Sequence, residues 1–194
     1  MAEVKTQVKS LLDQCWEVYT AGEVRLEHEA ETRRMQPPKE GSAPGRSVDR
    51  RRTSQSFFGA LSLTSKKVTL YPIEGNRNTE QTILAPDLLQ RETEAEKIAV
   101  VLDNARFHHV KALTALYEPG RLLERITPIH LPPYAPDHNP VEHVRNTAKN
   151  NIANIQRETP EETFGAFASH VTGRAVDHDF EHLPPHETRN DPVP

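Results

Sequence analysis

Asp103 is the residue of this sequence whose position is most suggestive of chemistry. It directly follows the apolar run from Ile98 to Leu102, which is short and rich in β-branched residues and is therefore typical of a buried strand. A strand that is apolar on both faces belongs inside a covered sheet, and the point where it emerges is the usual place for site chemistry in open α/β sheets. The alternative is that Asp103 and Asn104 only turn the chain, since both residue types tolerate turn geometry.

Glu142 is the second candidate, and it follows the proline-rich loop at 132–136. Asn139 is a favourable N-cap residue, Pro140 fits the first helical position, and Glu142 then stands at the third helical position. This spacing is that of a capping box with Asn in place of Ser or Thr. Glu142 could therefore cap its own helix and do no chemistry, and the spacing alone leaves both roles open.

The elements that must position these residues follow from the apolar patterning of the chain. Alternating and short apolar runs predict strands at 23–29, within a hairpin at 54–75, at 98–102 and at 125–131. Apolar residues at three- and four-residue steps predict helices at 3–20 (ended by Gly22), 78–92, 109–117, 140–155 and 160–175.

Two other features carry polar residues of interest. His28 lies on the apolar face of strand 23–29, where a hydrogen-bonded buried histidine is the simpler interpretation and a site residue the sharper one. Arg50, Arg51 and Arg52 follow one another in the Pro- and Gly-rich loop at 36–53. They could contact phosphates, although three charges in a row are also common on solvated loops.

The composition limits the classes of protein that remain. The chain has 194 residues, enough for one domain with a core and tails, and its formal net charge is −4. This charge is not that of a basic nucleic-acid-binding domain, so DNA contacts would depend on local patches. One cysteine excludes an intrachain disulfide and a Cys-rich zinc site. No apolar run reaches the roughly 18 residues of a membrane span, so we expect a soluble, cytoplasmic protein without membrane contact.

The expected order of elements is strand, strand, strand, helix, strand, helix, strand, helix, which is that of a ribonuclease-H-like domain. Within it, the stretches VLDNARFHH and LPPYAPDHNPVEHV closely resemble the catalytic domain of DDE transposases of the mariner superfamily, in its bacterial insertion-sequence branch. The family form is roughly L-D-N-A-x-x-H and then L-P-P-Y-S-P-x-L-N-P-x-E. Here Ala135 replaces Ser and His138 replaces Leu.

The resemblance implies an α/β fold, a ribonuclease-H-like mixed five-stranded sheet flanked by helices, and a metal-dependent endonuclease that cleaves and joins DNA. It implies Asp103 and Glu142 as catalytic ligands of two Mg²⁺ or Mn²⁺ ions, which would neutralise the scissile phosphate and activate the attacking oxygen. Asn104, His108 and Asn139 are expected near the site. The implied partner is the DNA of transposon ends, with a homodimer as one assembly, and the implied location is the bacterial cytoplasm, on the nucleoid when bound to DNA.

The first carboxylate is where this sequence departs from the family. Members carry Asp at the end of the first strand, in a setting like E-D-E-A, and the corresponding text here is E-H-E-A, with His28 at the Asp position. An imidazole supplies one lone pair and no negative charge, so two dications held by Asp103 and Glu142 alone should bind weakly. Glu27 and Glu29 point to the opposite face in this interpretation. An Asp at position 28 is therefore expected to strengthen metal binding.

Two other departures concern Arg145 and the N-terminus. Arg145 stands where members often have Trp, and it would either lose packing or pair with a carboxylate. Only one helix is expected before the first strand, whereas members usually carry helix-turn-helix DNA-binding modules. We therefore predict an N-terminal helix left from a linker at 1–21, a DDE catalytic-type domain at 22–176 and a disordered polar tail at 177–194.

Three functions remain open at this point. The chain could be a transposase catalytic domain, a non-catalytic remnant of an insertion sequence, or a module that binds nucleic acid without cleaving it. A binding module should lose affinity for DNA steeply as salt rises, whereas a remnant should show no such binding.

Overall fold

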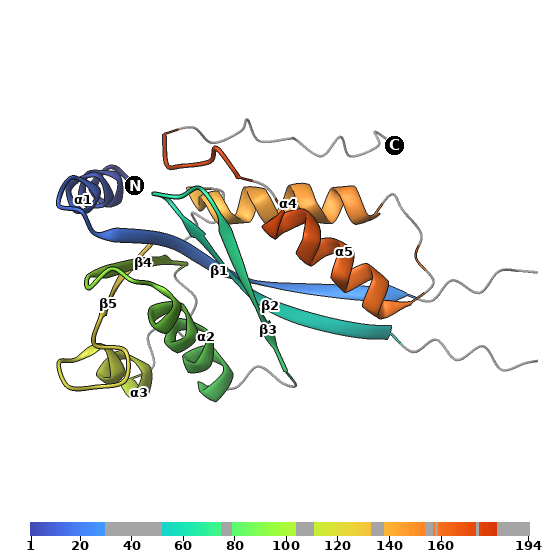
Figure 1. The fold of residues 1–194 in the computed structure, drawn as a ribbon, viewed down its shortest axis with the longest axis horizontal. Coiled ribbons are helices and arrows are strands. Elements are labelled where there is room, and N and C mark those ends of the chain that lie inside the picture. Colours follow the sequence, from blue (N-terminus) through green and yellow to red (C-terminus); the bar gives the residue numbers. More distant parts are fainter. Residues whose placement is uncertain are drawn as a thin grey trace, which may run out of the picture.

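The computed structural model describes residues 1–29, 52–74, 79–103, 111–132, 138–153, 157, 159–173 and 175–181. A mixed five-stranded sheet with the strand order β3-β2-β1-β4-β5 lies at its centre (Figure 1). The strands are β1 (Glu17–Glu29), β2 (Arg52–Ser62), β3 (Val68–Ile73), β4 (Ile98–Leu102) and β5 (Ile126–His130).

Pairing within the sheet follows the predicted ribonuclease-H-like order. β1 is antiparallel to β2, which is antiparallel to β3, and β1 is parallel to β4, which is parallel to β5. The short connection between β2 and β3 suits their antiparallel pairing, while each parallel pair requires a longer crossover connection. The prediction of a mixed five-stranded sheet flanked by helices is confirmed.

Helices cover both faces of the sheet. They are α1 (Ala2–Asp13), α2 (Thr79–Glu92), α3 (Lys111–Thr114) continued by the 3₁₀ helix η2 (Ala115–Tyr117), α4 (Pro140–Ala153) and α5 (Pro160–Thr172). In Figure 1, α2 and α3 lie below the sheet and α1, α4 and α5 lie above it. Across the described ranges, none of the helices combines the length and apolar character that crossing a bilayer would need.

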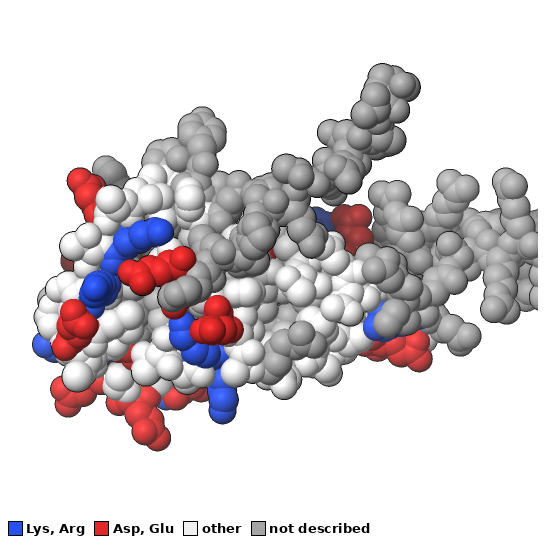
Figure 2. Space-filling view, turned by 90° about the horizontal axis from the view of Figure 1, so that it is seen from above, with Lys and Arg blue, Asp and Glu red and all other residues white. Residues whose placement is uncertain are grey.

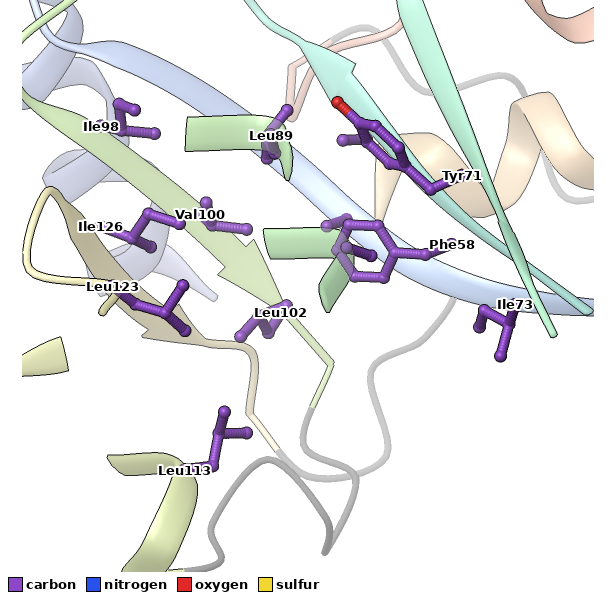
Figure 3. Packing of buried hydrophobic residues seen from close by; sticks show 13 residues of the cluster. Phe58, Tyr71, Ile73, Leu89, Ile98, Val100, Leu102, Leu113, Leu123 and Ile126 are labelled. Carbon is purple, nitrogen blue, oxygen red and sulfur yellow. The ribbon is translucent and has the colours of Figure 1, made fainter. Parts of the chain in front are cut away.

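Side chains along β1 alternate between these two layers. Ala21 belongs to the cluster on the α2–α3 side, which also contains Phe58, Leu89 and Val100, all labelled in Figure 3. Val18 packs instead with α1, and Val24 packs with α4 and α5. Even-numbered residues of β1 therefore face the layer of α1, α4 and α5, because strand side chains alternate.

The N-terminal helix is shorter than the predicted span of 3–20. Helix α1 ends at Asp13, and Cys15 adopts a left-handed conformation with φ of 62°. Strand β1 begins at Glu17, and its residues up to Thr20 pair with β4. The prediction was wrong because residues such as Val18 fit the helical spacing by chance, whereas their pairing with a strand 80 residues away determines their conformation. Gly22 accordingly lies within β1 rather than at a helix end.

The segment after α5 returns to the first half of the chain. The amide of Val176 donates to the carbonyl of Lys66 at 2.8 Å, and the Lys66 ammonium is 3.1 Å from an Asp179 carboxylate oxygen. Phe180 is buried in the cluster of α1. Residues 177–181 of the predicted tail are thus packed, and residues 182–194 lie outside the described part of the chain.

Candidate functional site

Asp103 leaves β4 beside the middle of β1. Thr20 and Val101 are the last paired residues of the parallel β1–β4 ladder. Extending this register by two residues places Gly22 opposite Asp103, which follows β4 directly. Val101 packs in the cluster of α1, and alternation places Asp103 on that same face. Asp103 is half-buried. Strand β4 therefore directs this carboxylate toward the layer that contains α4.

Asn139 attaches the start of α4 to β1 at the same place. Its side chain is fully buried, and its amide nitrogen donates to the carbonyl of Ala21 at 3.1 Å. Its side-chain oxygen accepts from the amide of Val141 at 3.3 Å, which confirms Asn139 as the N-cap. One side chain thus begins the helix and fixes it to the strand residue next to Gly22.

Glu142 forms an ion pair with Arg145, one turn later on α4. The Arg145 side chain is 5% exposed and that of Glu142 is 22% exposed, so the pair is largely withdrawn from water. The predicted capping box does not use the Glu142 carboxylate, which pairs with Arg145 instead. The positive charge of Arg145 neutralises the carboxylate that the motif singled out.

The Glu142–Arg145 pair lies directly on the backbone of Gly22. A Cβ atom built at Gly22 would lie 3.0 Å from Arg145 Nη1 and 3.2 Å from Glu142 Oε1. A glycine inside a strand often marks such a close approach, because any side chain would occupy the neighbour's space. The structure therefore brings Glu142, Arg145 and Gly22 together, and Asp103 directly follows the adjacent strand β4.

Lys149 adds a second positive charge one turn beyond Arg145. Burial lowers the pKa of the Lys149 ammonium, and repulsion from the Arg145 guanidinium lowers it further. The face of α4 that carries the Glu142 carboxylate therefore also carries two basic side chains, Arg145 and Lys149.

His28 lies elsewhere on β1. It is six residues beyond Gly22, a distance of about 20 Å along an extended strand. The residue is 6% exposed, and its Nδ1 shares a hydrogen bond of 2.9 Å with the hydroxyl of Thr163 in α5. The structure does not bring His28 together with Glu142, and the hydrogen bond fits a histidine that joins β1 to α5.

The other predicted site residues are only partly described. Asn104, His108, Arg50 and Arg51 lie outside the described residues, and Arg52 is the first residue of β2, opposite Glu29. Within the described ranges, no three His, Cys, Asp or Glu side chains are grouped so that they could hold a metal ion. Among the described carboxylates, Glu142 lies against Gly22, and Asp103 is placed opposite Gly22 by extension of the β1–β4 register.

Sequence reasoning did not single out Gly22. The available signal was a glycine directly before the predicted half-buried strand at 23–29, and a glycine in a strand pattern typically indicates a bulge or a close approach. That signal was assigned to the end of a helix. Its partner, Arg145, was noted as unusual, but nothing in the local sequence indicates that the two residues meet.

Comparison with known proteins gives one family. The model described as DDE superfamily endonuclease matches residues 17–163, from the start of β1 into α5. This range contains Gly22, Asp103, Glu142 and Arg145. No curated protein matches the sequence significantly.

Solved structures share the fold at low sequence identity. The Mos1 strand transfer complex superposes with a TM-score of 0.58 at 14% identity, over 92% of this chain and 51% of the Mos1 chain. The Mos1 paired-end complex with the left transposon end gives 0.55 at 12%, over 86% and 55%. The Mos1 mariner paired end complex with Mn gives 0.54 at 14%, over 88% and 54%. This chain thus spans about half the length of the Mos1 chains.

Proposed function

The chain belongs to the DDE superfamily endonuclease family, and on this premise we propose that it is the ribonuclease-H-like domain of a DNA transposase in which strand cleavage is impaired. Family membership and the intact sheet support the ancestry. The state of the acidic site supports the impairment.

DNA is the proposed partner. The Mos1 structures that share the fold are complexes described as a strand transfer complex and as a paired-end complex with a left transposon end. Figure 2, which views the molecule from above, shows Lys and Arg side chains interspersed with Asp and Glu over the described part of this face, without a single basic field. Binding would therefore be weaker than that of a basic DNA-binding domain, and would fall with salt as phosphate contacts are screened.

One observation carries the proposed impairment: Gly22 occupies the strand position that lies against Glu142 and that the extended β1–β4 register puts opposite Asp103. DDE-type cleavage requires carboxylates from separate elements to hold two divalent ions about 4 Å apart. In this geometry the first carboxylate would have to stand at position 22 rather than at His28, since position 22 is the one that contacts Glu142. Glycine offers no ligand there.

The residues present do not fit a two-ion site. Mos1 has been described with Mn and with Mg. In this chain one carboxylate of the site is paired with Arg145, the neighbouring strand position lacks a side chain, and Lys149 adds a further positive charge. Hard dications require negatively charged oxygen ligands, which are too few and too well neutralised here.

A DNA-binding and nicking experiment tests the proposal. The chain is titrated onto a labelled DNA duplex between about 50 and 200 mM salt, and in parallel is incubated with supercoiled plasmid and MgCl₂ or MnCl₂. We expect salt-dependent binding and no nicking above that of the matched Asp103→Asn variant. Nicking that disappears in Asp103→Asn would instead establish an active endonuclease, and an absence of binding at low salt would reject a role on DNA.

A further inference from the structure

We infer that the Arg145 guanidinium serves as a built-in cation of the acidic site. It lies between α4 and β1, in the space that a metal-binding carboxylate at position 22 would need. Gly22, which has no side chain, leaves that space open to the guanidinium. Gly22 and Arg145 then act as one unit that closes the site to divalent ions. The inference rests on the proposed function, because it concerns the acidic site whose impairment is proposed there.

The first argument is spatial. A Cβ at Gly22 would lie 3.0 Å from Arg145 Nη1 and 3.5 Å from Arg145 Cζ, so the guanidinium takes the volume that a side chain at position 22 would need. The guanidinium is the flexible end of its side chain and could be displaced. An Asp at position 22 would therefore require the Arg145 guanidinium to shift from its present position.

The second argument concerns the approach of the helix. Gly22 pairs with Gly59 across the β1–β2 ladder, and a Cβ at Gly59 would lie 3.8 Å from Val141 Cγ2. The first turns of α4 therefore pass over two facing glycines. Val141 is apolar and stands over Gly59, whereas the residue over Gly22 is charged and buried. Packing alone would favour an apolar residue there, because a buried charge needs compensation.

The third argument is electrostatic. Glu142 supplies that compensation, and a buried carboxylate left without its arginine would in turn be destabilised. With Asp103 and Glu142 ionised and Arg145 protonated, the site holds a net charge of −1, before the nearby Lys149 is counted. Removal of Arg145 alone restores one unit of negative charge, and an Asp at position 22 restores a second.

Manganese binding tests the unit directly. Calorimetric titration with MnCl₂ is carried out on the parent chain, Gly22→Asp, Arg145→Gln and the double variant. We expect weak binding by the parent and by Gly22→Asp, at least threefold tighter binding by Arg145→Gln, and at least a further tenfold in the double variant. Gains that exceed the sum of the single effects demonstrate coupling between the two positions.

Two matched controls separate the site from general charge effects. Arg91→Gln removes another ion-paired arginine, which bonds to Asp87 within α2 at 2.8 Å. Gly165→Asp adds a carboxylate at a glycine of α5 that has open space around it. Both should leave manganese affinity unchanged. Circular dichroism and thermal unfolding identify variants that fail to fold. If the double variant is one of them, Arg145→Gln alone decides, since its gain should be abolished by adding Asp103→Asn.

The inference is overturned if the parent binds manganese as tightly as the double variant, or if folded Arg145→Gln shows no gain. It is also overturned if Gly22→Asp contributes nothing in the absence of Arg145. These outcomes are independent of the DNA experiment. A chain that binds DNA without cleaving it, yet shows no change in manganese affinity among the variants, would reject the unit and leave the proposed function standing.

Discussion

The side-chain amide of Asn139 donates a hydrogen bond of 3.1 Å to the main-chain carbonyl of Ala21 across the boundary between α4 and β1. Both residues are fully buried, so neither group can turn to water instead. The same Asn139 side chain caps α4 through the amide of Val141. Asn139 therefore joins the start of α4, and with it Glu142, to the central strand β1.

We predict that Asn139→Ala lowers the free energy of unfolding by about 2–3 kcal/mol, because it removes a helix cap and leaves a buried carbonyl unsatisfied. Urea unfolding measures the change. Thr159→Ala is the matched control, since Thr159 caps α5 through Glu162 at an exposed position and should cost about 1 kcal/mol. Equal losses in the two variants would show that the bond to Ala21 adds nothing beyond the cap.

His28→Asp distinguishes the two candidate positions for the first carboxylate. The substitution should leave manganese affinity unchanged, since His28 lies against α5 and is about 20 Å from Gly22 along the strand. It should destabilise the fold by about 1–3 kcal/mol, because it replaces a hydrogen-bonded buried ring by a carboxylate. Calorimetry and urea unfolding provide the two readouts. A tenfold gain in manganese affinity would return His28 to the site.

Substitution to alanine should change the stability in opposite directions at Gly165, inside α5, and at Gly173, directly after it. Gly165→Ala should stabilise the protein by about 0.5–1 kcal/mol, because nothing lies within 4 Å of the new Cβ and alanine favours the helix. Gly173→Ala should destabilise it, since the Cβ would lie 2.6 Å from the carbonyl oxygen of Ser169. Thermal unfolding midpoints compare the two variants. Shifts of the same sign would contradict the described geometry of the helix end.

His178 should make the folded state sensitive to acid. Burial lowers its pKa, and repulsion from His143, whose ring is 6.3 Å away edge to face, lowers it further. A bond to the backbone of Asp177 and its charge act in the opposite direction, and Lys66 adds repulsion. Because the unfolded chain takes up the proton first, the free energy of unfolding should decrease as the pH falls below about 6.5.

Urea midpoints between about pH 5 and 8 measure this dependence. His178→Gln should flatten it, whereas His138→Gln, which removes an exposed histidine before α4, should not. An unchanged slope in His178→Gln would show that the acid sensitivity of the fold has another origin.

Much of the fold follows from local patterns in the sequence. The continuous apolar run at Ile98–Leu102 predicts a buried central strand, and β4 is buried along its whole length. The hairpin of β2 and β3, strand β5 and helices α2, α4 and α5 also begin and end near their predicted residues. The start of α4 was predictable because Asn139 and Pro140 carry their signals within one turn of each other.

The sequence by itself therefore determined the elements, their order, and the placement of Asp103 and Glu142 at the end of a strand and the start of a helix. Only the tertiary structure decided which residue of β1 meets them. The apolar spacing of 3–20 suits a helix, and pairing with β4 makes its last part a strand. The register of β1 with β4 and the packing of α4 on β1 then place Gly22, rather than His28, against Glu142 and Arg145. A contact between residues 120 positions apart, such as Gly22 and Glu142, leaves no local pattern in the sequence, because it depends on how whole elements pack.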